Sequence, residues 1–245
     1  MLTELLSQKI SPLLLSQQLL FALGTQIRVS GRENIPNDTA LLVVSNHRSF
    51  MDVAVLMVAI DLPIHFACHH YMRQVPFVSD LLDQLGFLPL DKPKERCNSF
   101  FEQASQLLRQ RQAIGIFPEG AIPMVQETSP NSMSQFQRGF AHLALRAPVE
   151  KLAILPIAIA VQQELNTPLF PVRWLQLFDA SEPLFDRADW HPLVLYHQVK
   201  VAIGQPIWVN QDPKQPQHGR QALAWVNKIT EDCYQEIQSL LNATL

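Results

Sequence analysis

The amino-acid sequence predicts a single-domain α/β fold in which helices flank a mostly buried central sheet. Helical and strand-like segments alternate along the chain, which is the pattern of an α/β domain. Several strand-like segments are continuous apolar runs, as expected of strands that are buried on both faces. The 245 residues, 47% of them hydrophobic, suffice for one large core, and no linker or internal repeat divides them.

The expected elements follow from the periodicity of apolar residues and from the turn-forming residues between them. Strands are predicted at Thr25–Val29, Ala40–Ser45, Ile64–Cys68, Phe87–Leu90, Ala113–Phe117, Leu152–Val161 and Val194–Ile203. Helices are predicted at Phe50–Ile60, Val78–Leu85, Arg96–Arg111, Gln135–Arg146 and Arg220–Leu241. The apolar stripe of the last helix runs through Leu223, Val226, Ile229, Tyr234, Ile237 and Leu241. Prolines are frequent from Pro168 to Pro216, where we expect loops or an irregular excursion.

Residues 1–23 form an N-terminal amphipathic helical segment in this prediction, and residues 24–245 form the main domain. Pro12 is expected to end or kink a first helix, and Leu13–Leu23 forms a second short one. The segment has no early basic cluster and no small-residue cleavage site, so a signal peptide is not expected. Polar residues recur too often for a membrane span. Two interpretations stay open, a helical cap on the core and docking on a membrane surface.

The composition excludes several classes of function. Charged residues make up 17% of the chain, against about a quarter in a usual soluble domain, which favours a lipid-facing surface or an apolar tunnel. The net charge of -3 argues against non-specific nucleic-acid binding. Cys68, Cys97 and Cys233 form no C-x-x-C spacing, so neither a disulfide framework nor a metal site is expected. Signatures of serine hydrolases, P-loop nucleotidases and Rossmann dehydrogenases are absent from the sequence.

The stretch Val43–Leu56, VVSNHRSFMDVAVL, contains a candidate catalytic pair, His47 and Asp52. Five helical steps would turn their side chains apart, so they meet only if His47 precedes the helix and Asp52 lies in its first turn. The S-x-x-D pattern that begins at Ser49 favours this arrangement, with Ser49 as N-cap. A carboxylate partner would orient the imidazole as a general base. The alternative is that Asp52 only caps the helix and His47 only fills a turn.

Two further stretches place polar groups at the ends of short strands. In AIGIFPEGA, Glu119 follows a buried-type strand, where ligands of open α/β sheets bind, and Gly120 permits a close backbone approach. The alternative is a β-turn with a solvated Glu119. In GFLPLDKPKER, the cations Lys92, Lys94 and Arg96 could hold a phosphate, or could belong to a solvated helix start.

Taken in order, these stretches resemble the blocks of the glycerophospholipid acyltransferase family, which includes the lysophosphatidic acid acyltransferases. The family hallmark N-H-x-x-x-x-D is matched by Asn46–Asp52, and its F-P-E-G block by Phe117–Gly120. A second block resembles Gly86–Lys92, and an apolar strand with an internal proline resembles the run around Pro156. FQRGFAHLAL and VKVAIGQPI also resemble family segments, so the matches extend over roughly Thr25 to Trp208.

The resemblance implies an O-acyltransferase of phospholipid synthesis. It would move a fatty acyl group from acyl carrier protein or coenzyme A to the hydroxyl of a lysoglycerolipid, chiefly 1-acylglycerol-3-phosphate. It implies that His47 is the base and that Asp52 orients it. Substrate-binding roles are implied for Asn46, Ser49, Lys92, Phe117, Pro118, Glu119, Gly120 and Arg138. The thioester is already activated, so no metal or redox cofactor is expected, and the protein is expected at the cytoplasmic face of a membrane as a peripheral protein.

Departures from the family pattern leave the acceptor open. Ala121 and Ile122 stand where the family usually has Thr-Arg, and Lys92 replaces an arginine and so lacks its bidentate fork. Both changes weaken a phosphate site, although Lys94 or Arg138 could compensate. A different lipid acceptor, a non-catalytic lipid-binding relative and a thioesterase that passes the acyl group to water stay as alternatives.

Overall fold

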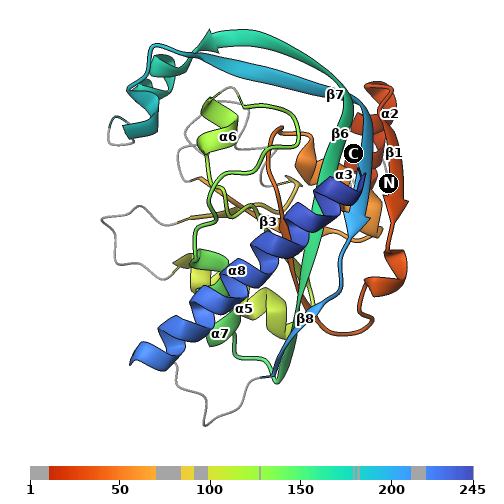
Figure 1. Ribbon diagram of the computed structural model, residues 1–245, viewed down its shortest axis with the longest axis vertical. Coiled ribbons are helices and arrows are strands. Elements are labelled where there is room, and N and C mark those ends of the chain that lie inside the picture. Colours follow the sequence, from red (N-terminus) through yellow and green to blue (C-terminus); the bar gives the residue numbers. More distant parts are fainter. Residues whose placement is uncertain are drawn as a thin grey trace, which may run out of the picture.

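The computed structural model describes residues 11–69, 84–90, 99–126, 128–178, 180, 183–210 and 219–244. Its strands are β1 (Gln26–Ser30), β2 (Ala40–Ser45), β3 (Ile64–Cys68), β4 (Leu88–Pro89), β5 (Ala113–Ile116), β6 (Lys151–Pro171), β7 (Trp190–Ile203) and β8 (Ile207–Asn210). They form one sheet in the order β1-β7-β6-β2-β5-β3-β4, with β8 also paired to β6 (Figure 1). The predicted α/β fold is confirmed.

Strand β2 lies in the middle of the sheet, parallel to β5 on one side and to β6 on the other. All six of its residues are buried, as its continuous apolar run predicts. Because β2 and β5 run parallel, their carboxyl ends meet at the same edge of the sheet. The segments that follow them, around His47 and Phe117, are therefore brought together at that edge.

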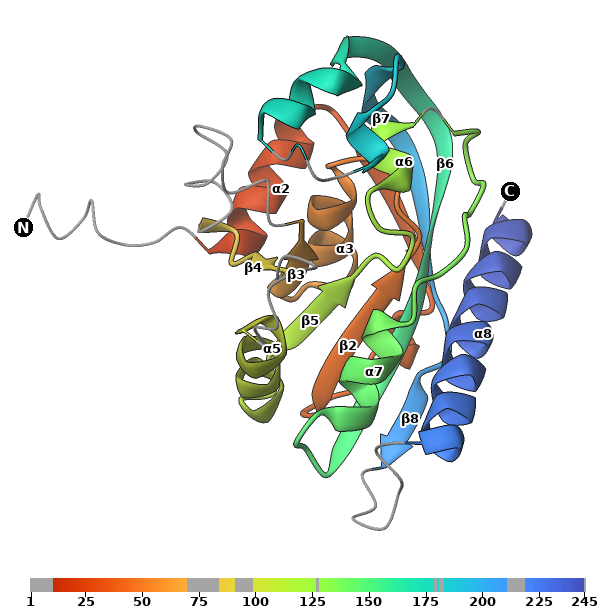
Figure 2. The ribbon, with the colours of Figure 1, turned by 90° about the vertical axis from the view of Figure 1, so that its left-hand side faces the viewer.

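Helices cover both faces of the sheet (Figure 2). They are α2 (Pro12–Ala22), α3 (Asp52–Ile60), α5 (Ser99–Arg109), α6 (Ile122–Val125), α7 (Gly139–Arg146) and α8 (Gly219–Thr244), with 3₁₀ turns η1 (Arg32–Asn34), η3 (Val172–Leu177) and η4 (Pro183–Phe185). Alternate residues of β2 point to opposite faces. Leu42 and Val44 join the core under α5, α7 and α8, while Leu41 and Val43 join the core under α2 and α3.

The sheet differs from the prediction mainly in the lengths of β6 and β7 and in the presence of β8. Strand β6 continues past Val161 to Pro171, and β7 begins at Trp190, so the two form a long antiparallel hairpin across part of the proline-rich stretch. The prediction ended β6 too early because the continuous apolar run stops at Val161 and the largely polar residues 162–167 follow it. Strand β8 was not predicted, since it has only four residues. The predicted helix Val78–Leu85 lies outside the described residues except for its last two.

The C-terminal helix α8 is confirmed, but its buried stripe differs in two positions. Ala222 and Cys233 are buried, whereas the predicted Leu223 is 46% exposed and Tyr234 is only partly buried. Ala222 precedes Val226 by one helical turn of four residues, so it lies on the stripe and the larger Leu223 does not.

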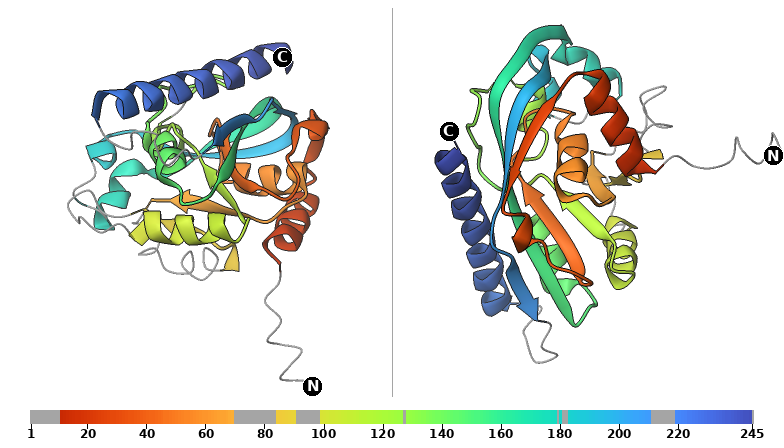
Figure 3. Two further views of the ribbon diagram at one scale, coloured as in Figure 1. Left: turned by 90° about the horizontal axis from the view of Figure 1, so that it is seen from below. Right: turned by 90° about the vertical axis from the view of Figure 1, so that its right-hand side faces the viewer.

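Helix α2 begins at Pro12, which occupies its first turn, where the missing N–H costs nothing. One side of α2 packs on α3: Leu20 is buried, and the Ser16 hydroxyl contacts the Met57 sulfur at 3.4 Å. The opposite side exposes apolar side chains, with Phe21 at 89%. Helix α2, coloured red, lies beside α3 (Figure 3). Within the described part of the chain, no helix is both long enough and apolar enough to span a bilayer.

Candidate active site

His47 and Asp52 meet as the five-residue spacing predicts. The Nδ1 atom of His47 lies 2.8 Å from Oδ2 of Asp52. His47 is in the turn after β2, and Asp52 is the first residue of α3. A helix start favours a carboxylate there, because the helix dipole and the free N–H groups are positive at this end. With Nδ1–H donating to Asp52, Nε2 of the neutral ring carries the lone pair that can accept a proton.

The Asp52 carboxylate is 1% exposed, and protein donors surround it. Its Oδ2 also accepts hydrogen bonds from the backbone N–H groups of Arg48, at 2.7 Å, and Ser49, at 2.9 Å. Its Oδ1 accepts one from the Tyr196 hydroxyl at 2.7 Å. The bond to the Ser49 N–H is the one that the capping pattern predicts for Asp52.

The position of the N-cap corrects the prediction. Met51, not Ser49, precedes the first helical residue. The chain makes a tight turn first, in which the Asp52 N–H donates to the Ser49 carbonyl at 3.0 Å. The Ser49 hydroxyl donates to the Val194 carbonyl of β7 at 2.6 Å and accepts from the Met51 N–H. Ser49 therefore fastens the turn to the sheet.

The imidazole of His47 is held between its carboxylate and an aromatic stack. Phe117 lies parallel to the ring, with centroids 4.1 Å apart, and Phe66 stacks on the other side of Phe117 at 5.2 Å. The side chain of His47 is 13% exposed. The ring is thus fixed by Asp52 and Phe117 while one edge stays accessible.

Glu119 links the two turns at this edge of the sheet. Its Oε1 accepts the backbone N–H of His47 at 2.9 Å. Its Oε2 accepts the backbone N–H of Ser134 at 2.6 Å and the hydroxyl of Ser134 at 2.7 Å. The side chain is buried, so the alternative of a solvated Glu119 is wrong. Its role toward an acceptor stays a prediction.

Two asparagine side chains continue the hydrogen bonding of β6 beyond the end of β2. Asn46 donates to the Ile159 carbonyl at 3.0 Å and accepts from the Ile159 N–H at 2.8 Å. Asn131 makes the same pair of bonds with Val161. These bonds position the turn that carries His47, and a substrate contact of Asn46 stays a prediction.

The other residues predicted to bind substrate do not all lie at the site. Pro118 is buried, and Gly120 adopts a left-handed backbone conformation with φ of 69°, which suits glycine. Arg138 is exposed and donates to Asn227 of α8 at 2.9 Å. Lys92 lies outside the described residues.

Sequence reasoning missed two groups that contact the site. Arg48 forms a largely buried ion pair with Glu164 of β6, at 2.5 Å, and also donates to the carbonyl of Thr128 at 2.6 Å. The Glu164 carboxylate raises the pKa of Arg48. Tyr196, from the middle of β7, supplies the fourth hydrogen bond to Asp52. No spacing in the sequence links Glu164 or Tyr196 to this turn, because each comes from a distant strand.

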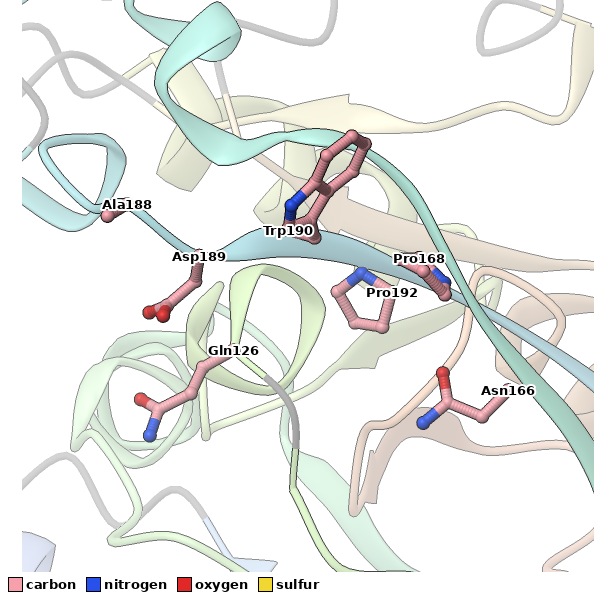
Figure 4. Close-up of a pocket in the computed structure, with 7 residues that line it drawn as sticks. All are labelled: Gln126, Asn166, Pro168, Ala188, Asp189, Trp190 and Pro192. Atoms are coloured by element: carbon pink, nitrogen blue, oxygen red, sulfur yellow. The ribbon is translucent and has the colours of Figure 1, made fainter.

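A cavity of about 510 Å³ lies at the outer end of the β6–β7 hairpin (Figure 4). Gln126 and Asn166 line it, each two positions from an Arg48 partner, Thr128 and Glu164. The described residues that line it are Gln126, Asn166, Pro168, Ala188, Asp189, Trp190 and Pro192. These residues present amide, carboxylate and indole groups, and Arg187 donates to the lining Gln126 at 2.8 Å.

The chain is similar to known proteins over the part that contains the His47–Asp52 turn and the Glu119 turn. The sequence profile of the family described as Acyltransferase matches residues 26–160. A 1-acyl-sn-glycerol-3-phosphate acyltransferase of Borreliella burgdorferi is 28% identical over 141 residues, which are 57% of this chain and 53% of the relative. An uncharacterized protein of Mycobacterium tuberculosis is 29% identical over 191 residues, 74% of this chain and 52% of the relative. The chain thus spans about half the length of these relatives.

The fold resembles the crystal structure of the 1-acyl-sn-glycerophosphate (LPA) acyltransferase PlsC from Thermotoga maritima. The TM-score is 0.53 at 20% sequence identity, over 91% of this chain and 77% of that chain. The profile match covers more than half of the chain and includes both the His47–Asp52 turn and the Glu119 turn. The chain belongs to the acyltransferase family.

Proposed function

We propose that this chain transfers a fatty acyl group from a thioester to the hydroxyl of a lysoglycerolipid, with 1-acylglycerol-3-phosphate as the leading acceptor. The observation that carries the proposal is the pairing of His47 Nδ1 with Asp52 Oδ2 at 2.8 Å at the start of α3. Relatives named 1-acyl-sn-glycerol-3-phosphate acyltransferase support the choice of acceptor.

In the proposed reaction, Nε2 of His47 takes the proton of the acceptor hydroxyl. The oxygen attacks the thioester carbonyl, and the tetrahedral intermediate then collapses. The C–S bond breaks, the ester forms, and the imidazolium returns its proton to the leaving thiolate. Asp52 stabilises the imidazolium and keeps the ring in the tautomer that exposes Nε2. The thioester supplies the activation, so the step needs only the acyl donor, acyl carrier protein or coenzyme A, as co-substrate and no metal or redox cofactor.

A different lipid acceptor is the second candidate, and two observations favour it. Ala121 and Ile122 begin the short helix α6 and supply neither a hydroxyl nor a cation. The cavity at the outer end of the β6–β7 hairpin offers the amides of Asn166 and Gln126 and the carboxylate of Asp189, which can bind headgroup hydroxyls, and Arg187 is a cation beside it that donates to Gln126 at 2.8 Å.

The proposal includes a peripheral position at the cytoplasmic face of a membrane, since both the acceptor and the product are membrane lipids. The exposed side of α2 supports it: Leu14 is 45% and Phe21 89% exposed, and seven residues, or two helical turns, separate them, so they lie on one face. Apolar side chains on one face of a short helix can insert at the boundary between headgroups and acyl chains.

The test is an acyl-transfer assay with radiolabelled acyl-CoA or acyl carrier protein, a panel of lysolipids, and the wild-type, His47→Ala and Asp52→Asn proteins. We expect labelled phospholipid from the wild type and a loss of about 10² to 10⁴-fold in His47→Ala. Asp52→Asn should lose less, because the amide oxygen can replace Oδ2 and still accept from Nδ1 of His47, although the charge and the acceptor for the Tyr196 hydroxyl are removed.

Other outcomes would point elsewhere. Equal turnover in wild type and His47→Ala would overturn the mechanism. Free fatty acid as the main product would indicate a thioesterase, and lipid binding without turnover a non-catalytic relative. Faster transfer to a neutral, polyhydroxy lysolipid than to lysophosphatidate would favour the second acceptor.

A further inference from the structure

Tyr196 lies 144 positions after Asp52, yet its hydroxyl donates to Oδ1 of Asp52 at 2.7 Å. It is 1% exposed and belongs to none of the motifs that indicate the active site. Asp52 Oδ2 serves His47 and two backbone N–H groups, so Tyr196 is the side chain that engages the other oxygen. A carboxylate held at both oxygens cannot rotate without losing hydrogen bonds.

The tyrosine is fixed by the backbone around it. Its N–H contacts the sulfur of Met51, the residue next to Asp52, at 3.2 Å, and its carbonyl accepts the Thr25 hydroxyl at 2.9 Å. Met51 is fully buried. The strand that carries Tyr196 therefore packs directly against the turn that carries Asp52.

The hydroxyl stays protonated over the range in which the enzyme would work. Burial, followed by the neighbouring Asp52 carboxylate, raises the pKa of Tyr196 well above its usual value. The other charged groups that influence it are Arg48, on the same turn as Asp52, and Glu164 on β6. Tyr196 is therefore a hydrogen-bond donor to Asp52 and does not act as a base.

We propose that Tyr196 is a positioning residue for acyl transfer: its hydroxyl holds Asp52 so that the other carboxylate oxygen faces Nδ1 of His47. The inference rests on the proposed function, in which His47 is the base. Without this bond, the Asp52 carboxylate can rotate and one of its buried oxygens has no hydrogen-bond donor. The imidazole of His47 is then held less firmly in the orientation that exposes Nε2.

The experiment compares Tyr196→Phe, Asp52→Asn, the double variant and Tyr234→Phe. The last is a matched control, because Tyr234 packs edge-to-face on Phe136 in the core beneath α8. We expect Tyr196→Phe to lower kcat about 10-fold, the cost of a hydrogen bond to a charged group, with both KM values within about twofold. In the Asp52→Asn background the same change should cost less than about threefold, because Tyr196 acts through the carboxylate.

Two readouts separate positioning from mere packing. The acidic limb of the kcat/KM profile should move to higher pH in Tyr196→Phe. Without the Tyr196 donor, the Asp52 carboxylate holds a proton on its partner His47 more strongly, so the base is freed at a higher pH. The limb should not move in Tyr234→Phe. In protein labelled with ¹⁵N-histidine, the His47 Nδ1–H resonance, assigned by its loss in His47→Ala, should shift or broaden in Tyr196→Phe only.

The resonance also separates this inference from the proposed function, because it does not need turnover. An inactive wild type with the expected resonance change would reject acyl transfer yet support the positioning contact. An active wild type, with unchanged kcat, pH profile and resonance in Tyr196→Phe, would overturn the positioning role alone. So would an equal fold-loss in the wild-type and Asp52→Asn backgrounds.

Discussion

Glu119 accepts a hydrogen bond from the backbone N–H of His47 at 2.9 Å, although 72 positions separate the two residues. The bond joins the turn after β2 to the turn after β5. The other carboxylate oxygen accepts from Ser134, so both oxygens of the buried Glu119 have protein donors.

This contact predicts that Glu119→Gln lowers kcat and leaves the KM for the acceptor nearly unchanged. The amide NH₂ of glutamine would face either the His47 N–H or the Ser134 N–H, so one donor would lose its acceptor. We expect a kcat loss of about 10-fold or more, measured by steady-state kinetics. Glu150→Gln, at an exposed turn, is the control. A rise in KM with unchanged kcat would instead indicate direct acceptor binding by Glu119.

The ion pair of Arg48 and Glu164 predicts a large effect on stability. The two side chains are 7% and 12% exposed, so Glu164→Gln leaves a guanidinium largely buried without its counter-charge. We expect the free energy of unfolding to fall by about 3 kcal/mol in urea titrations. The exposed pair of Arg111 and Asp38 provides the comparison, and Asp38→Asn should change stability little. Similar small losses in both variants would contradict the buried pair.

His191 predicts part of the pH dependence of folding. Burial lowers its pKa in the folded protein below the usual value. As the pH falls through about 6.5, the unfolded chain takes up a proton that the folded chain resists, so stability decreases toward acid pH.

His191→Phe removes this contribution and can keep the stacking on Phe170, whose ring centroid lies 4.8 Å from that of His191. The loss of urea midpoint between about pH 7.5 and pH 5.5 should therefore be smaller in the variant. His142, whose pKa burial also lowers, is present in both proteins and does not affect the comparison. An identical loss in both proteins would contradict the prediction.

The exposed side of α2 predicts that the double substitution Leu14→Gln and Phe21→Gln reduces co-sedimentation with phospholipid vesicles severalfold. The melting temperature should change little, since these two side chains are on the side away from α3. Deleting the helix would be a poorer test, because its buried Leu20 packs in the core. Leu223→Gln with Trp208→Gln removes exposed apolar residues elsewhere and should keep vesicle binding. Equal vesicle binding in all three proteins would refute the docking role.

The sequence by itself determined the α/β class, most of the strands and helices, and the relation of His47 to Asp52. These depend on local information: apolar periodicity, turn residues and a five-residue spacing that leaves one workable geometry. The same local criteria ended β6 at Val161, since the continuous apolar run stops there, and they put Leu223 rather than Ala222 on the buried stripe of α8.

Only the tertiary structure decided which groups surround the pair. Tyr196 and Glu164 reach it from the β6–β7 hairpin, and Glu119 reaches it because β2 and β5 are parallel neighbours. Hydrogen bonds between residues so far apart in the chain depend on strand order and register, which no spacing within a motif encodes. The sequence therefore indicated a base and its carboxylate, whereas the packing of the strands determined which groups hold that carboxylate in place.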